Sequence, residues 1–360
     1  MTARPPSLST LADLSALTDQ FAAAQFTDDT RLFAFVGDGL PDLLVESFCG
    51  TETVCGAGAG AHWIVDVLSS QAAHSIRDWR FKQAALGIRQ ADGSTDWRSG
   101  YLQSIQQLDA DGGLVRYRLT LVPGLWLATQ ARRNRVFQNK PILQIIEEVL
   151  APYAPYVRWQ IDAGVDTLLA DLAPRPMIVQ YQESDYTFIT RLMAEEGIGW
   201  SGAESSAQGE APDFAAGAAH TLHLFATGDS FTEDPNSAAD GGIRWHQASS
   251  QEAADALFDW RQSRQIRTNQ TATLSWAWAH KRALVAIEES AARPAHVPPL
   301  ERFSDVHDSR QLSGGDAQRY ASMQQTQIDT SQWGIGCASS VRSLSVHSWF
   351  DFVNYASFNQ

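Results

Sequence analysis

The chain has 360 residues, 44% of them hydrophobic, and its 41 acidic and 27 basic side chains give a formal net charge of -14. This length predicts two or three domains, each large enough to bury a core. Phosphate backbones and anionic lipid surfaces repel so acidic a protein, so the composition disfavours nucleic acid and stable membrane association as partners.

The cysteines and the N-terminal residues indicate a chain that folds in a reducing compartment. Cys49, Cys55 and Cys337 are too few for the disulfide framework of a secreted protein, and small buried thiols are expected at Cys49 and Cys55. In residues 1–30, leucines recur at helical spacing and Asp13 interrupts them, which predicts an amphipathic helix and a linker rather than a signal peptide. These leucines are Leu8, Leu11, Leu14 and Leu17.

Residues 31–130 have the pattern of an antiparallel β domain, either a barrel or a sandwich. Apolar and polar side chains alternate from Leu114 to Val122, so one face of this strand should be buried and the other wet. The Asp-Gly-Gly turn before it makes Tyr101 to Leu108 the natural hairpin partner. The short apolar runs that predict further strands are Arg31 to Val36, Leu43 to Phe48 and His62 to Leu68.

Residues 131–235 predict a mixed α/β domain with two helices. The first follows Pro141, with Asn139 as its cap, because apolar residues then recur at three and four positions. The second has Ser184 as its cap and ends at Gly197. The remaining segments of this domain are strands from Met177 to Tyr181 and from Thr221 to Phe225, and a loop over residues 201–219.

Residues 236–346 predict a second β domain. Leu274, Trp276 and Trp278 fall on one face of a strand, opposite Thr273, Ser275 and Ala277. Gly314 to Gln327 predicts one further helix. The whole order is that of an α+β fold in which two antiparallel β domains flank a mixed insertion.

Neither a cofactor nor a metal ion is predicted. The glycines of Gly56 to Gly60 do not follow G-x-G-x-x-G, and Arg80 stands where an acidic ribose partner would be needed, so a hairpin loop is the better interpretation. His220 and His223 point to opposite faces of the predicted strand, and no Cys or carboxylate completes a metal-ligand set with them.

Paired carboxylates raise the alternative of a glycosidase, which needs two facing acids. The pairs are Glu147 with Glu148, Glu195 with Glu196, and Glu288 with Glu289. Adjacent helical residues do not face each other, and Arg191 with Glu195 has the four-residue spacing of an ion pair, so a structural role is favoured and no catalytic residue is predicted. A carboxylate-dependent cell-wall hydrolase using Glu183 and Asp185 stays as the alternative of another class.

Two segments carry a family resemblance. Arg132 to Lys140, with the sequence RRNRVFQNK, and the stretch from Val179 to Ile198, which begins VQYQESD, resemble the hub-like N-terminal region of VgrG-type spike proteins of type VI secretion systems. The matching positions are Arg135, Phe137, Gln138, Gln180, Tyr181, Glu183, Ser184, Asp185, Phe188, Arg191, Leu192, Glu195, Glu196 and Gly197. At Glu183 to Asp185 the match favours a structural helix start over catalysis.

The resemblance implies a phage tail hub-like fold with β-barrel-like domains over residues 31–130 and 236–346. It also implies a non-enzymatic homotrimer whose six barrel modules dock on a hexameric tube protein and which delivers effector or adaptor proteins. Such a chain is made in the bacterial cytoplasm and is secreted by the contractile machine. Residues 347–360 are expected to be the truncated start of a further barrel, because the family continues into one. The segment departs from the family pattern at His347, where a glycine usually precedes the Trp-Phe pair. A phage tail or tailocin baseplate hub is the structural alternative.

Overall fold

The computed structural model describes residues 31–56, 58–71, 74–90, 92–111, 113–204, 210–217, 220–246, 255–277, 281–294, 296–306 and 313–353. The helix expected in residues 1–30 lies outside these ranges. The described chain divides into two compact units. The first holds the residues up to Trp126 with Tyr153–Trp159 and Ser201–Leu222, and the second holds the rest. The domain boundaries expected at residues 131 and 236 stay predictions.

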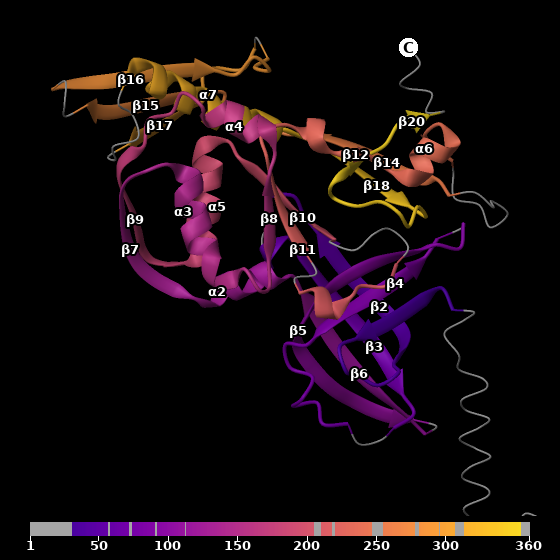
Figure 1. Ribbon diagram of the computed structural model, residues 1–360. Coiled ribbons are helices and arrows are strands. Elements are labelled where there is room, and N and C mark those ends of the chain that lie inside the picture. Colours follow the sequence, from indigo (N-terminus) through magenta and orange to yellow (C-terminus); the bar gives the residue numbers. More distant parts are fainter. Residues whose placement is uncertain are drawn as a thin grey trace, which may run out of the picture. The chain divides into compact units, whose positions relative to one another are not determined.

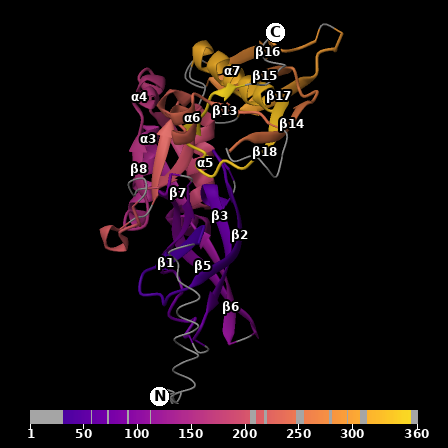
Figure 2. The same cartoon turned by 90° about the vertical axis from the view of Figure 1, so that its right-hand side faces the viewer.

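The first unit is built on one antiparallel sheet of six strands (Figure 2). Its strands are β1 (Phe33–Gly37), β2 (Leu44–Glu52), β3 (Ala61–Ser69), β4 (Gln83–Arg89), β5 (Thr95–Asp111) and β6 (Leu114–Val122), in the order β1-β4-β5-β6-β3-β2. The sheet curls into a half-barrel whose edge strands are β1 and β2. Arg31 Nη1, just before β1, donates to the carbonyl of Val45 in β2 at 3.1 Å and so links the two edge strands. The predicted strands and the β5–β6 hairpin are confirmed.

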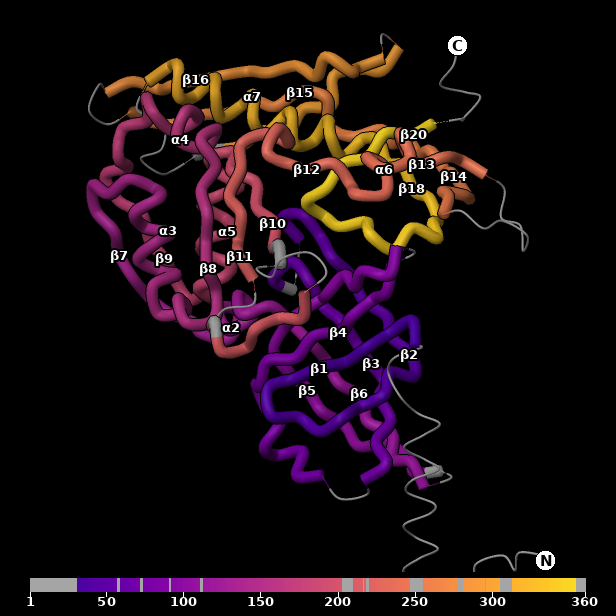
Figure 3. Tube along the Cα trace, turned by 45° about the vertical axis from the view of Figure 1, so that its right-hand side comes forward, coloured from indigo at the N-terminus to yellow at the C-terminus, as the bar shows by residue number. Residues whose placement is uncertain are grey.

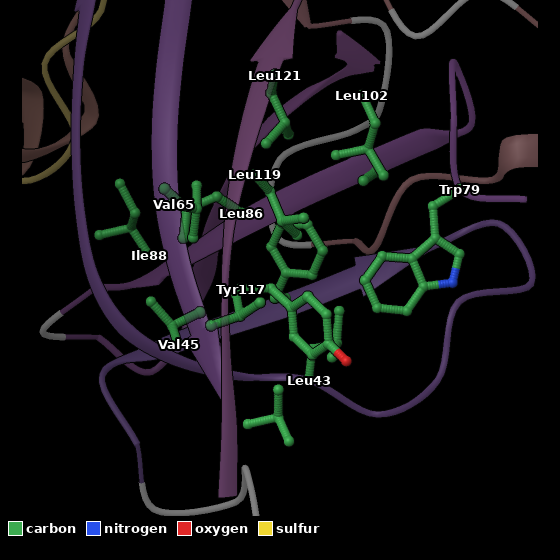
Figure 4. Close-up of a cluster of buried hydrophobic side chains, with 14 residues drawn as sticks. Leu43, Val45, Val65, Trp79, Leu86, Ile88, Leu102, Tyr117, Leu119 and Leu121 are labelled. Carbon is green, nitrogen blue, oxygen red and sulfur yellow. The ribbon is translucent and has the colours of Figure 1, made fainter. Parts of the chain in front are cut away.

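Alternating side chains of this sheet form the core of the first unit, shown in Figure 4. Tyr117, Leu119 and Leu121 of β6 are fully buried, and each such side chain contributes about 1.5–3 kcal/mol through burial. The intervening Arg116 and Arg118 point outward and pair with acids of β2 and β3. The alternating sequence of β6 therefore predicts its buried and its exposed face correctly.

Two sequence expectations in this unit need correction or refinement. Cys49 and Cys55 are exposed rather than buried, because the outward positions of β2 and the turn after it hold them. The stretch Gly58–Gly60 is a short 3-10 turn in the connection between the paired strands β2 and β3, as the hairpin-loop interpretation predicted.

The second unit begins with a ribbon of two long strands that carries helices on one face (Figure 1). Strands β7 (Arg132–Lys140) and β9 (Arg175–Ser184) pair antiparallel. Helices α3 (Ile142–Leu150) and α5 (Asp185–Glu196) contact β7 and β9, and the short α2 (Leu127–Gln130) contacts α5. Asn139 is not the cap of α3: Pro141 holds that position, while Asn139 lies in β7 with a left-handed φ of 49°, which asparagine tolerates.

A three-stranded sheet and a short helix complete the mixed region. The sheet has the order β10-β11-β8, from β8 (Arg158–Ile161), β10 (Gly199–Glu204) and β11 (His220–Phe225), and α4 (Ala163–Leu169) follows β8. The expectation of a loop from residue 201 is wrong, because β10 continues to Glu204. The strand predicted from Thr221 to Phe225 is confirmed, and His220 and His223 alternate in burial along it.

The C-terminal part of the second unit consists of separate small sheets (Figure 3). Strand β14 (Leu257–Arg264) pairs with β18 (Trp333–Ser339), and β16 (Arg282–Glu289), β15 (Gln270–Ala277) and β17 (Glu301–Val306) form a sheet in that order. Helix α7 (Gly314–Thr330) packs on this second sheet. A closed second barrel stays a prediction, and Trp278 lies outside the described residues.

Short parallel pairings hold the last described residues. Strand β12 (Thr232–Glu233) pairs with β19 (Ser348–Trp349), and β13 (Ile243–Arg244) pairs with β20 (Phe352–Val353), with α6 (Pro235–Asp240) between β12 and β13. None of the helices in the described ranges has the length and apolar character needed to cross a bilayer.

Candidate functional site

The two segments singled out by sequence come together on the ribbon β7–β9 and helix α5. The local signals of the helix are confirmed: Ser184 Oγ accepts from the backbone N–H of Thr187 at 3.0 Å, and Gly197 ends the helix with a left-handed φ of 77°. A Cβ at Gly197 would also lie 3.0 Å from Cε of Met323, so both backbone and space favour glycine there.

A buried acid forms the first polar cluster of the site. Asp185 has no exposed surface, and its carboxylate lies 3.3 Å from Arg135 Nη1 and 3.4 Å from Arg133 Nε. Gln180 Nε2 donates to the same carboxylate at 2.8 Å and is itself fully buried. Because a buried charge is costly unless paired, these partners and the positive end of the α5 dipole are what allow an acid at this position.

A second cluster is a chain of alternating acids and arginines. Arg191 bridges Glu183 at 2.6 Å and Glu195 at 3.0 Å, the latter at the four-residue spacing predicted from the sequence. Arg175 continues the chain from Glu195, at 2.7 Å, to Glu196. Arg191 therefore joins Glu183 to Glu195, and Arg175, which the motif does not contain, adds Glu196 to the chain.

Glu196 connects this chain to the C-terminal sheets. Arg319 of α7 donates to Glu196 Oε2 at 3.0 Å and to the Glu196 carbonyl at 3.2 Å. Burial alone lowers the pKa of Arg175, but Glu196 and Glu195 outweigh it and raise that pKa above its ordinary value. Arg175 therefore stays charged, and the cluster clamps α5, β9 and α7 to one another.

The apolar motif residues belong to the core beneath these clusters. The rings of Phe137 and Phe188 stack with centroids 5.7 Å apart, and Leu192 is fully buried. The guanidinium of Arg191 lies 5.4 Å above the Phe188 ring, which couples the charged chain to this core.

Two motif residues are not brought to the clusters. Gln138 and Tyr181 lie exposed on the outer face of the ribbon, and Tyr181 keeps 69% of its surface accessible. Sequence reasoning also missed Arg133, Arg175 and Arg319 as partners. Strand alternation could have suggested Arg133, which shares a face with Arg135, but nothing local marks Arg319, 123 residues from its partner Glu196.

The geometry is unsuited to the hydrolase alternative. Asp185 is inaccessible and already bonded by Gln180, so it cannot meet a substrate, and Glu183 is occupied by Arg191. A cavity of about 270 Å³ lies beside the charged chain, but its wall residue Glu196 is held by Arg175 and Arg319. Across the ranges that the structure describes, no three His, Cys, Asp or Glu side chains gather as a metal site would require.

The curled sheet, the ribbon with its helices and the small sheets after it define a phage tail-like fold. A tail protein from Neisseria meningitidis has a similar structure, with a TM-score of 0.54 and 11% identity over 84% of this chain and 78% of that one. The sequence matches the phage tail baseplate hub (GPD) family over residues 61–360. The chain belongs to this family.

Two curated relatives are type VI secretion system spike proteins of Pseudomonas aeruginosa. VgrG1b is 26% identical over 218 residues, which cover 59% of this chain and 26% of that protein. VgrG1c is 22% identical over 302 residues, which cover 82% of this chain and 38% of that protein. The chain therefore spans between about a quarter and two fifths of the relatives' length, and the resemblance to VgrG-type spikes drawn from the motifs is confirmed.

Proposed function

We propose that this chain is the structural hub of a type VI secretion spike, which trimerises, docks on a hexameric tube and carries effector or adaptor proteins forward. The observation that carries the proposal is the family match over residues 61–360, together with the VgrG relatives. In this role the chain is made in the cytoplasm and leaves the cell through the contractile machine. Its work is geometric, and no bond is broken.

Symmetry gives the proposed role its physical content. Two barrel-like modules per chain, over residues 31–130 and 236–346, would present six similar modules in a trimer and so match a sixfold ring. The mixed region, residues 131–235, links the two modules along the chain. Identical subunits that close into such a ring contact one another head to tail.

The motif residues act as a brace in this proposal. The chain of Glu183, Arg191, Glu195 and Glu196 fixes α5 against β9 and α7, and the Asp185 cluster fixes the start of the same helix on the ribbon. A hub that transmits force needs such rigid joints. The pairs that include the buried Asp185 and Glu196 supply them, because separating such a pair leaves an uncompensated buried charge.

Mass measurement tests the oligomeric part of the proposal. Purified chain is run over a range of concentrations with light scattering, alone and with the hexameric tube protein of the same host. A trimer that binds the tube supports the proposal. A monomer at high micromolar concentration that ignores the tube contradicts it.

The baseplate hub of a phage tail or tailocin is the second candidate, favoured by the family description and by the Neisseria tail protein fold. It uses the same assembly with a different tube. Pull-down from the native host separates the two candidates, because a secretion spike recovers secretion tube protein and a tail hub recovers tail tube protein.

A further inference from the structure

The second unit carries two uncovered apolar faces on different sheets. The first, called here the sheet face, lies on β15–β17 and consists of Trp276, Val285, Ile287 and Phe303, which are 51–63% exposed. The second, the ribbon face, lies on β7–β9 and consists of Val136, Met177, Val179 and Tyr181, which are 39–69% exposed. Contiguous apolar surface of this kind marks protein contact sites.

The sheet face is apolar because the sheet presents mostly small side chains to its own helix. Thr271, Thr273 and Ser275 of β15 are buried on the side of α7, and Thr271 donates to Gln325 of that helix at 2.8 Å. Leu284 and Ala286 of β16 are buried on the same side, against Ala317 and Ala321. The bulky alternate positions therefore point away from α7. Within the described ranges, no element of the chain buries them.

Strand register orders the sheet face into rows. Ile287 and Phe303 both align with Ala272, one on each side, so the two bulky side chains flank a small one. In the neighbouring row Glu289 and Glu301 both align with Gln270. The outward positions of the three strands include carboxylates and no lysine or arginine, so the apolar face ends in an acidic row. Within this row Glu289 lies 3.8 Å from Arg293, so Glu301 carries the charge that the inference uses.

The ribbon face has the opposite charge. Val136 aligns with Val179, and Met177 lies opposite Gln138, while Phe137 and Ile178 between them face the helices. The exposed Arg132 lies four positions before Val136 on the same side of β7.

No carboxylate occupies the outward positions of either ribbon strand. These positions are Arg132, Asn134, Val136, Gln138, Met177, Val179 and Tyr181. The ribbon face is therefore apolar with a basic end.

We infer that the sheet face of one copy docks on the ribbon face of the next copy in the ring. The inference rests on the proposed trimer and names its contact surfaces. A closed ring of identical chains needs two different, complementary faces on every copy, and these two faces match apolar centre to apolar centre and acidic end to basic end. Since each copy carries both faces, a second copy is the occupant whose chemistry the structure itself supplies.

Cross-linking tests which faces meet. In a background with Cys49, Cys55 and Cys337 changed to Ser, Tyr181→Cys and Phe303→Cys are made singly and together, and a short bifunctional maleimide is added. The double variant should give covalent dimers and trimers, and each single variant should give none. Cross-linking of either single variant alone overturns the head-to-tail arrangement, because it brings a face against its own copy.

Exchanging opposite charges tests whether the acidic end of the sheet face meets the basic end of the ribbon face. Arg132→Glu and Glu301→Arg should each weaken trimer formation, and the double variant should recover it. On the apolar part, Val285→Asp and Val179→Asp should each weaken association by about tenfold or more, the size of an interface hot spot. Ile266→Asp is the matched control, since Ile266 is 70% exposed in the β14–β15 connection and outside both faces.

The outcomes separate this inference from the proposed function. If the parent chain is a trimer and all face variants remain trimers, the faces serve another partner and the inference is overturned while the hub proposal stands. If the parent chain is a monomer at every concentration, both fail. Circular dichroism of each variant confirms that the substitutions act on assembly and leave the fold intact.

Discussion

Removing the charge of Asp185 tests the buried cluster at the start of α5 directly. Asp185→Asn keeps the size of the side chain and an oxygen that can accept from Gln180, but it leaves Arg133 and Arg135 without their shared anion. The perturbation therefore isolates the electrostatic part of the cluster. It also removes the acid on which the hydrolase alternative depends.

The expected loss of stability follows from the burial of Asp185, Arg133 and Arg135. Breaking a fully buried ion pair costs about 3–5 kcal/mol. Here the side chains of Arg135 and Arg133 keep 23% and 46% of their exposure, so water can partly replace the lost carboxylate. We therefore expect the free energy of unfolding of the second unit to fall by about 2–3 kcal/mol. For a unit of this size, that loss lowers the Tm by roughly 4–12 °C.

Urea unfolding and calorimetry measure this loss, with Asp171→Asn as the matched control. Asp171 is exposed, so the same change there should move the free energy of unfolding by less than about 0.5 kcal/mol. Equal stability of the two variants would refute the argument that the cluster braces the helix. The trimer mass of Asp185→Asn at low temperature shows whether the brace is needed for assembly or only for stability.

Three further predictions concern the cap, a pair of histidines and the core of the first unit. Ser184→Ala should cost about 1 kcal/mol in urea unfolding because the Thr187 N–H loses its acceptor, and Ser184→Thr should restore most of it. The rings of His223 and His347 lie 4.7 Å apart, and burial lowers the pKa of both, with His223 lowering that of His347 further. The unfolded chain then binds more protons as the pH falls below about 6.5, so stability should drop there; a variant with Phe at both positions should lose less Tm between neutral and acid pH, and equal losses would contradict the pairing. Leu119→Ala should destabilise the first unit by about 2–5 kcal/mol in calorimetry, because Leu119 is fully buried. An alanine substitution at an exposed position of the same sheet is the control and should have a small effect.

Local signals allowed much of the fold to be predicted from sequence. Ser184 and Gly197 mark the ends of α5 because capping depends on residues within one helical turn. The β5–β6 hairpin follows from alternation and a turn, which are also local. Asn139 failed as a cap because two signals competed, and the fixed φ of Pro141 decided where the helix begins.

Long-range partners account for what the sequence could not predict. Arg319 meets Glu196 only because the tertiary structure brings α7 to the end of α5, and no spacing rule covers 123 residues. The side of β15 that faces the helix was also undetermined, since Thr273 and Trp276 alternate equally well in either orientation. The structure shows that Thr273 and Ser275 face α7, and this orientation of β15 leaves Trp276 exposed on the sheet face.

The stoichiometry of the complex with the tube is the most direct test of the account. Native mass spectrometry of the chain mixed with its tube protein should give a species with three hub chains, each of 39.5 kDa, on one ring of six tube subunits. A complex with one hub chain per ring, or with six, would contradict the proposal that paired modules in a trimer match a sixfold tube.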